Sequence, residues 1–340
     1  MQRSELTIDL GAIRRNVTRL LAVLESAQLW AVVKADGYGH GAIDVAGAAL
    51  GAGASMVCVA TVAEALELRE EYGDARILVM GPILTSREIA LAREARLELV
   101  VSDAEIPEGV PVHLKLDTGM GRWGLSELFD PPRGVVGLMS HLASADCDPA
   151  FTERQIADFA EATEPHRHLT RHLANSAGAL RFPDARFDAA RCGVAIYGLS
   201  PFGTDPGEDG LEPALSWTSH LAQVRQLAPG ESTGYGRRFV AELPTWIGIV
   251  PVGYADGFRR DLTGTEVRVA GELRRAVGTV SMDAFAVELD RELPVGTPVT
   301  LLGHGVLAED HARVAGTINY ELACGINRNP ARATRVVLDA

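Results

Sequence analysis

The sequence is poor in cysteine, in cationic residues and in long apolar runs. Its four cysteines are widely separated and form no CxxC pair, so we expect neither disulfides nor a bound metal, but reduced thiols in a cytoplasmic protein. No apolar run reaches the length of about 18 residues that a membrane span needs. The 32 Lys and Arg residues are outnumbered by 45 Asp and Glu, and the net charge of −13 argues against nucleic-acid or anionic-membrane partners.

Short apolar runs dominate the first two thirds of the chain. With 47% hydrophobic residues, the 340-residue chain can bury a large core. Eight runs rich in Val, Ile and Leu occur, at Trp30–Lys34, Met56–Ala60, Arg76–Met80, Glu98–Ser102, His113–Asp117, Val135–Ser140, His168–Leu173 and Gly193–Tyr197. Helical patterns separate several of them, for example Ala63–Glu71, Ser86–Ala95 and Phe151–Ala162. This alternation predicts a (β/α)8 barrel of the TIM type, with its chemistry at the carboxyl ends of the strands.

The barrel pattern is incomplete in one region and ends near residue 215. Asp103–Pro111 is too short for a full helix and Leu125–Gly134 contains two prolines, so at least one outer helix is expected to be missing or reduced. Later runs are separated by Gly, Pro and charged turns, and a helical pattern returns only at Ala315–Cys324. We therefore expect a barrel domain over residues 9–215 and a mostly antiparallel β domain over 216–340 that also takes in residues 1–8.

Lys34 is the most informative residue for function. It ends the run that begins at Trp30 and precedes the glycine-rich segment Ala35–Gly41. An ammonium group at the tip of a buried strand is costly unless it is neutralised or used. A lysine on a rigid strand beside a glycine-rich turn is what an aldehyde cofactor needs to form a Schiff base. On this segment alone, a lysine that merely reaches solvent is an equally good interpretation.

Further polar residues cluster at the ends of the predicted strands. They are Lys115, Asp117, Arg122, His141, Asn175 and Ser176, with Arg191 just before the eighth run. Asn175–Gly178 and Gly193–Val194 fall in the loops that commonly bind phosphate in such barrels, although an ordinary helix N-cap also explains the first. The segment Gly37–Gly41 does not match a dinucleotide fingerprint, and no Walker A motif occurs, so a nucleotide is not expected.

Three motifs of the second domain have two interpretations each. They are Val252–Gly257, Ser281–Phe285 and Thr317–Glu321. Each is compatible with an ordinary turn that packs an aromatic or Met side chain. A tyrosine between two glycines, as at Tyr254, is more exposed than packing requires, which keeps a functional role open.

Taken together, eight segments of the chain resemble the alanine racemase family of pyridoxal-phosphate (PLP) enzymes. The matching stretches are AVVKADGYGHG, HLKLDTGMGRWG, SHLASAD, ANSAGAL, ARCGVAIYG, VGYADG, SMDAF and TINYE. They occur in the family's order over nearly the whole chain. The barrel-plus-β architecture implied by the family agrees with the one predicted from periodicity.

The resemblance implies roles for individual residues. Lys34 matches the lysine that binds PLP, and Arg191 matches the arginine that faces the pyridine nitrogen, with His141 in the network behind it. Arg122 resembles a residue that contacts the cofactor and the substrate carboxylate, to which Met282 donates from its backbone. Lys115 matches a lysine that is carbamylated in relatives. The positions expected at the cofactor phosphate are Tyr38, Tyr320, Ser176, Gly193, Val194 and the adjoining Asn175.

Racemisation requires proton removal from one face of Cα and delivery to the other. The resemblance implies Lys34 as the base for the D isomer and Tyr254, contributed by the partner of a homodimer, as the base for the L isomer. A tyrosine with an ordinary pKa of about 10 costs about 4 kcal/mol to ionise at pH 7, so nearby cations such as Arg191, acting through His141, are expected to lower that cost. Arg191 itself stays protonated and cannot supply a proton to the ring, which we expect to suppress side reactions such as transamination.

The leading interpretation is therefore interconversion of L- and D-alanine, which supplies D-alanine for peptidoglycan. A racemase of broader specificity, acting for example on serine, stays open, because Thr279 stands where many relatives have an arginine that shapes substrate entry. A PLP decarboxylase is disfavoured by the tyrosine of Gly253–Gly257. A non-catalytic PLP carrier is disfavoured by the second domain.

Overall fold

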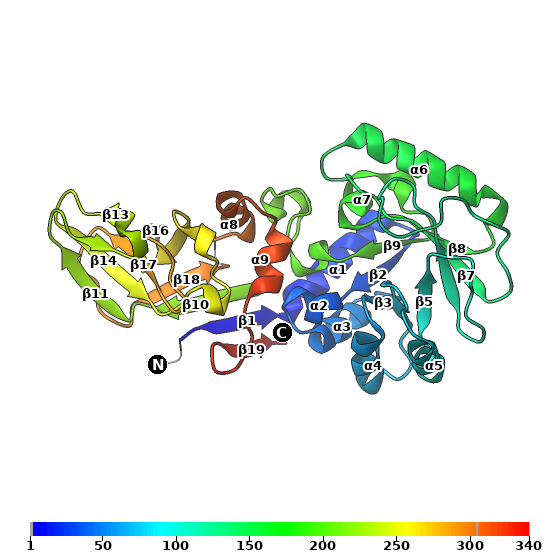
Figure 1. Cartoon of the computed structure of the whole chain (residues 1–340), viewed down its shortest axis with the longest axis horizontal. Helices are drawn as coiled ribbons and strands as arrows, with labels where there is room; N and C mark the ends of the chain where they lie inside the picture. Colours follow the sequence, from blue (N-terminus) through cyan, green and yellow to red (C-terminus); the bar gives the residue numbers. More distant parts are fainter. Residues whose placement is uncertain (1–2, 304, 340) are drawn as a thin grey trace. The chain divides into compact units, whose positions relative to one another are not determined.

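The computed structural model describes residues 3–303 and 305–339. It divides into two compact units (Figure 1). The barrel unit comprises Ala12–Phe202 and Pro206–Glu212, and the β unit comprises Met1–Gly11, Gly203–Asp205 and Pro213–Ala340. None of the helices formed by the described residues has the length and apolarity needed to cross a membrane.

The barrel unit is a closed barrel of eight parallel strands, all within residues that the structure describes. The strands, in the order in which they pair around the barrel, are β2 (Gln28–Val32), β3 (Met56–Val59), β4 (Ile77–Val79), β5 (Glu98–Val101), β6 (Val112–Lys115), β7 (Val135–Met139), β8 (Thr170–His172) and β9 (Ala189–Cys192). The α-helices of this part of the chain are α1 (Leu10–Leu24), α2 (Lys34–Tyr38), α3 (Ala42–Gly51), α4 (Val62–Glu71), α5 (Ser86–Glu94), α6 (Pro149–Thr163) and α7 (Ser176–Arg181). Short 3-10 turns lie at η1 (Glu164–His166), η2 (Pro183–Ala185), η3 (Val194–Tyr197) and η4 (Pro206–Asp209).

The starts of the outer helices α4, α5 and α6 are fixed by capping side chains. Thr61 and Thr85 cap α4 and α5 in capping boxes, in which the threonine accepts from the N3 amide and a glutamate at N3 reaches back to the cap amide. Asp148 caps α6 ahead of a proline at its first position. As predicted, the described segments Asp103–Pro111 and Leu125–Gly134 contain no helix.

The predicted fold class is confirmed, with one wrong strand. Seven of the eight apolar runs overlap a barrel strand, but the eighth strand is Ala189–Cys192 rather than Gly193–Tyr197. The latter forms the 3-10 turn η3, because Gly193 has φ −106° and ψ −94° and Gly198 is left-handed, which ends any extended conformation. Arg191 consequently lies within the strand and not in a loop before it.

The β unit is built on a twisted sheet of mostly antiparallel strands. Among the described residues its order is β11–β14–β17–β16–β15–β18–β10–β1–β19. The bounds are β1 (Glu5–Asp9), β10 (Leu215–His220), β11 (Gln223–Leu227), β14 (Thr245–Val250), β15 (Glu266–Val269), β16 (Glu272–Val277), β17 (Phe285–Leu289), β18 (Pro298–Leu302) and β19 (Thr334–Leu338). A separate hairpin joins β12 (Ser232–Thr233) and β13 (Phe239–Val240).

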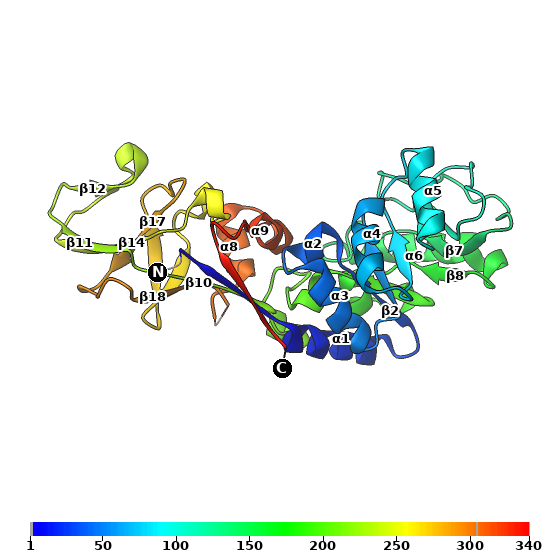
Figure 2. The ribbon, with the colours of Figure 1, turned by 90° about the horizontal axis from the view of Figure 1, so that it is seen from below.

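The two chain ends meet in this sheet. Strand β1 pairs antiparallel with β10 and parallel with β19, with Glu5 opposite Thr334. Figure 2 shows the blue β1 and the red β19 running side by side. The first strand therefore belongs to the β unit.

The remaining elements of the β unit are short helices and turns. They are η5 (Tyr235–Arg237), η6 (Tyr254–Asp256), η7 (Arg260–Leu262), α8 (Ala308–Ala315) and α9 (Asn319–Gly325). The helix expected over Ala315–Cys324 is present only from Asn319 onward, as α9, and α8 is an additional helix that the sequence pattern does not predict. Gly316 adopts φ +64° and ends α8, and the chain restarts as α9.

Candidate active site

Lys34 begins a strained turn directly after the first barrel strand. The strand ends at Val32, and Ala35, Asp36, Gly37 and Tyr38 all have φ between +48° and +61°, a left-handed turn in α2. Non-glycine residues pay roughly 1–2 kcal/mol each for this conformation, so surrounding contacts must impose it. Glu64 accepts from the amide of Ala35 at 2.8 Å and Asp36 accepts from the amide of Ala42 at 2.7 Å. The half-buried lysine is thus mounted on a rigidly held turn.

Tyr38, Ser176 and Gly193 come together on three different segments. A methyl group at Gly193 would lie 2.5 Å from Oη of Tyr38, so only glycine permits this approach. The hydroxyl of Ser176 accepts from the amides of Gly193 at 3.1 Å and Ala195 at 3.3 Å. The ring of Tyr38 also stacks on Tyr197, with centroids 4.9 Å apart. The predicted phosphate residues Tyr38, Ser176, Gly193 and the adjoining Val194 are therefore neighbours.

Asn175 has the ordinary role left open by the sequence. Its Oδ1 accepts from the amide of Gly178 at 2.9 Å and caps the short helix α7. Its Nδ2 points back to the carbonyl of Leu142 at 3.4 Å. The side chain of Asn175 therefore holds the turn in which Ser176 lies.

Arg191 is buried in β9 at the centre of a hydrogen-bond network. Its Nη1 donates to Nδ1 and to the carbonyl of His172, both at 2.8 Å. Its Nη2 donates to the carbonyl of Ser140 at 2.7 Å and lies 3.2 Å from Nδ1 of His141. Among the described residues no acceptor is paired with Nε of Arg191, so this N–H is the donor left for a ligand.

The network continues through the barrel interior to Glu98. Nε2 of His172 lies 2.8 Å from Nδ1 of His113, and Nε2 of His113 lies 2.9 Å from Oε2 of Glu98, which also pairs with Arg76. Burial is the main cause that lowers the pKa of both histidines, so both are neutral. Because Arg191 can only donate, each ring must accept at Nδ1 and donate from Nε2. The three hydrogen bonds that link Arg191, His172, His113 and Glu98 therefore all run in one direction, from Arg191 to Glu98.

Four cations surround His141 at the mouth of the barrel. Burial comes first among the causes that hold the pKa of His141 well below its usual range, followed by the positive charges of Arg191, Lys115, Arg122 and Lys34. Burial is also the main cause that lowers the pKa of Lys115 to about 8, with Arg122 and Arg191 adding to it. The structure thus brings the predicted lysines, arginines and histidine of the barrel into one electropositive region.

Arg122 lies on a loop organised by Asp117. The carboxylate of Asp117 accepts from the amides of Gly119, Met120 and Gly121 at 2.8 to 3.1 Å. The guanidinium carbon of Arg122 lies 4.9 Å from the ring centroid of Trp123, a cation–π contact. Asp117 therefore gives the glycine-containing loop a defined shape, and Arg122 is exposed at the end of this loop.

Tyr254 and Met282 are exposed neighbours in the β unit. The amide of Tyr254 donates to the carbonyl of Ser281 at 3.1 Å, and the amide of Ala255 donates to the carbonyl of Met282 at 3.0 Å. Tyr254 lines an open cavity of about 420 Å³ together with Arg238, Arg259, Arg260, Asp261 and Thr279. The hydroxyl of Thr279 donates to the carbonyl of Tyr235 at 2.8 Å. Three arginines and one aspartate make the lining of this cavity net cationic beside the Tyr254 phenol, which suits a small carboxylate.

Tyr320 is held at the start of α9. Its amide donates to Oδ1 of Asn319 at 2.9 Å, and Nδ2 of the buried Asn319 donates to Glu309 at 2.7 Å. The next residue, Glu321, pairs with Arg259. The β unit thus contributes three of the predicted site residues, Tyr254, Met282 and Tyr320. The other predicted site residues belong to the barrel unit.

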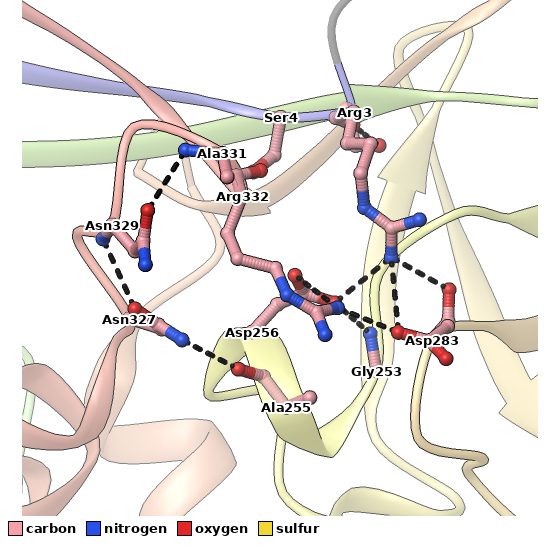
Figure 3. Close-up of polar contacts among 11 residues, drawn as sticks. Arg3, Ser4, Gly253, Ala255, Asp256, Asp283, Asn327, Asn329, Ala331 and Arg332 are labelled. Atoms are coloured by element: carbon pink, nitrogen blue, oxygen red, sulfur yellow. Dashed lines mark hydrogen bonds and ion pairs between the residues drawn. The ribbon is translucent and has the colours of Figure 1, made fainter.

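Sequence reasoning missed the supporting residues of both units. Glu98, His113 and His172 face the barrel interior, and the signal available was a charged or imidazole side chain within an otherwise apolar strand. In the β unit the missed residues are Arg3, Asp256, Asp283 and Arg332, which form the ion pairs shown in Figure 3. Asp256 and Asp283 fall within the motifs Val252–Gly257 and Ser281–Phe285, but no local pattern indicates their pairing with Arg3 and Arg332, since the paired residues lie 49 to 253 positions apart.

The arrangement defines a class of protein. The α/β barrel carries an amine at a strand end, a cradle of hydroxyl and amide groups, and a buried arginine with one remaining donor. Together these groups can hold a small anionic ring compound. The β unit adds a phenol. This is the layout of a two-domain barrel enzyme that acts on small amino or carboxylic acids.

Comparison with known proteins identifies the family. The model of the alanine racemase N-terminal domain matches residues 8–201, and that of the C-terminal domain matches residues 214–334. The alanine racemase of Lactiplantibacillus plantarum is 39% identical over 99% of this chain and 98% of its own, and that of Geobacillus kaustophilus is 41% identical over 94% and 91%. The biosynthetic alanine racemase of Pseudomonas aeruginosa superposes with a TM-score of 0.92 at 38% identity, covering all of both chains. The chain belongs to the alanine racemase family, whose members are isomerases that interconvert L- and D-alanine.

Proposed function

We propose that this chain racemises alanine with PLP bound covalently through Lys34. The observation that carries the proposal is the left-handed turn that mounts Lys34 beside Tyr38, Ser176 and Gly193. PLP supplies an aldehyde for the lysine amine and a conjugated ring that stabilises negative charge at Cα. The cradle fits its phosphate, because a side chain at position 193 would fill the space beside Oη of Tyr38.

Several residues would hold and orient the cofactor. Tyr38, Ser176, Gly193, Val194 and Tyr320 would bind the phosphate, with Asn175 shaping the turn. The remaining Nε–H of Arg191 suits the ring nitrogen, because the rest of its guanidinium is already paired to protein acceptors. Burial lowers the pKa of the Arg191 guanidinium to about 10, so the group remains protonated at neutral pH and donates without giving up its proton.

Two bases on opposite faces of Cα would carry the proton. Lys34 would take or return it on the face used for D-alanine, and Tyr254 of the partner subunit would do so for L-alanine. Arg122 and the backbone amide of Met282 would hold the substrate carboxylate. The exposure of Tyr254 and Met282 on one loop pair supports a site completed by a second copy in a homodimer.

Three further assignments belong to this proposal. Lys115 would be carbamylated, since a buried amine with a pKa of about 8 is partly unprotonated near neutral pH and adjacent arginines favour the resulting anion. The product D-alanine would serve peptidoglycan synthesis in the cytoplasm, a location supported by the free cysteines. Activity on serine is the alternative favoured by the open cavity at Thr279.

Reductive trapping tests the covalent assignment directly. Lys34 and Lys115 are the only lysines of the sequence, so borohydride reduction of the PLP-loaded protein and peptide mapping has two possible internal targets. We expect the phosphopyridoxyl mass on the Lys34 peptide, and none in Lys34→Ala, which should also lack absorbance near 420 nm. Label on Lys115, or none in the wild type, would refute the assignment.

Proton exchange at Cα tests the two bases. In D2O, Tyr254→Phe should exchange the α-proton of D-alanine much faster than that of L-alanine, because Lys34 still serves the D isomer. If Tyr254→Phe exchanges both enantiomers at wild-type rates, Tyr254 is not the second base.

A further inference from the structure

The loops that carry Tyr254 and Met282 form one fixed unit within the β unit. Besides the two backbone hydrogen bonds between them, Gly253 lies so close to the second loop that a methyl group on it would be 2.2 Å from the carbonyl oxygen of Ser281. The carboxylate of Asp256 accepts from the amide of Gly253 at 2.8 Å and closes the first loop on itself. Movement of one loop therefore moves the other.

Two arginines from the chain ends hold this loop pair. Nη2 of Arg3 lies 3.2 Å from Oδ2 of Asp256 and donates to the carbonyl of Asp283 at 3.0 Å. Nη1 of Arg332 donates to Oδ1 of Asp283 at 2.5 Å and lies 3.4 Å from Oδ1 of Asp256. Figure 3 shows both guanidinium groups converging on the two carboxylates. Each arginine thus contacts both loops.

The sheet register explains why these two arginines act together. Strands β1 and β19 are parallel, with Glu5 opposite Thr334, and the same register extended back by two residues places Arg3 opposite Arg332. Two adjacent guanidinium groups repel unless anions lie between them. Asp256 is only 2% exposed, so its carboxylate in turn requires these cations and the Gly253 amide.

We propose that Arg3 and Arg332 are positioning residues for the second catalytic base, a proposal that rests on the role of Tyr254 proposed above. They act through Asp256 and Asp283 and touch neither substrate nor cofactor. Tyr254 and Met282 are 43% and 51% exposed, so their own side chains have little packing to fix them, and the backbone beneath them must do so.

The test uses Arg332→Gln, with Arg335→Gln at an exposed position of β19 as the control and Tyr254→Phe as the reference. Racemisation itself is a poor readout, because a loss at either base slows both directions equally. Exchange of the α-proton in D2O, followed by 1H NMR for each enantiomer, separates the two bases. Thermal unfolding of each variant reports the folded fraction.

We expect Arg332→Gln to slow exchange of L-alanine by about 10- to 100-fold and that of D-alanine by no more than about threefold, since displacing a base by about 1 Å is costly. Arg332→Lys, which keeps the charge but has fewer donors, should show the same asymmetry at smaller size, and Arg335→Gln should show none. Arg332→Lys also serves as the test if the glutamine variant does not fold.

The outcomes separate this inference from the proposed function. Equal loss for both enantiomers in the Arg332 variants, in parallel with the folded fraction, would mean that the arginines only stabilise the fold. An asymmetric loss in Tyr254→Phe without one in either Arg332 variant would leave Tyr254 as the base and refute its positioning by Arg332. No asymmetry in Tyr254→Phe would overturn the base assignment itself.

Discussion

Nη1 of Arg191 donates to Nδ1 of His172 at 2.8 Å, and this single contact sets the direction of a hydrogen-bond network through the barrel. Since the guanidinium has no acceptor, His172 must carry its proton on Nε2 and pass the same polarity to His113 and Glu98. The orientation of Arg191 at the barrel mouth is therefore supported from the barrel interior.

Replacing His172 should unfold the protein more easily. His172→Phe removes the acceptor of Arg191 and the donor to His113, leaving buried polar groups without partners, and we expect a loss of about 2–4 kcal/mol in the free energy of unfolding. Urea denaturation of the apoprotein measures it. His168→Phe, at an exposed position, is the control and should change stability by less than about 0.5 kcal/mol. If His172→Phe and His168→Phe both change the free energy of unfolding by equally small amounts, the hydrogen-bond network does not stabilise the fold.

Glu98 should make stability depend on pH. Burial by itself raises the pKa of Glu98, but hydrogen bonds from His113 and Arg76 outweigh it and bring the pKa from its ordinary 4.5 to about 2. When the pKa of a carboxyl group is lower in the folded state than in the unfolded state, the group stabilises the fold above its unfolded-state pKa. This stabilisation is lost as the pH falls through the folded-state pKa. Glu98→Gln should therefore be less stable than wild type by up to about 3 kcal/mol at pH 6 to 7.

The difference between wild type and Glu98→Gln should shrink between about pH 4.5 and pH 2, as Glu98 becomes protonated. Urea titrations at a series of pH values provide the curve. Glu94→Gln, on the exposed side of α5, is the matched control. A gap between Glu98→Gln and wild type that stays constant with pH would contradict the pairing of Glu98.

The sequence predicts the barrel because buried parallel strands are near-continuous apolar runs. It misplaces the eighth strand because Ala189–Cys192 has small residues and a buried arginine, whereas the neighbouring Val194–Tyr197 has the expected apolar composition. The pattern also misses α8 and predicts a helix that begins too early, at Ala315, because the left-handed Gly316 between α8 and α9 leaves little trace in the sequence.

Some site residues can be predicted from the sequence and others cannot. Lys34 can be nominated from its place after an apolar run, but the left-handed conformation of Ala35, Asp36 and Tyr38 cannot, because non-glycine residues rarely adopt it without tertiary support. The ion pair of Arg3 and Asp256 joins residues 253 positions apart, and no short-range spacing encodes such a contact. Residues at element ends are therefore predictable, and those that support them through long-range contacts are not.

Lys115 should react with carbon dioxide. Its amine attacks CO2 to form a carbamate and releases one proton, a step that requires the unprotonated amine. Because the pKa of Lys115 is about 8, the reactive fraction rises between about pH 7 and pH 9. We expect a carbamate signal by 13C NMR after incubation with labelled bicarbonate, absent in Lys115→Arg. A signal that persists in Lys115→Arg would place the carbamate elsewhere.

Gly193→Ala should weaken PLP binding more than it weakens the fold. The added methyl group would lie 2.5 Å from Oη of Tyr38, so the tyrosine must move out of the proposed phosphate cradle. We expect the dissociation constant for PLP, measured by fluorescence titration, to rise at least about tenfold, or about 1.4 kcal/mol. Gly51→Ala, where a methyl group on α3 meets no atom within 4 Å, is the control and should leave PLP affinity unchanged. If Gly193→Ala binds PLP as tightly as the wild type does, the close approach of Tyr38 to Gly193 is not needed for phosphate binding.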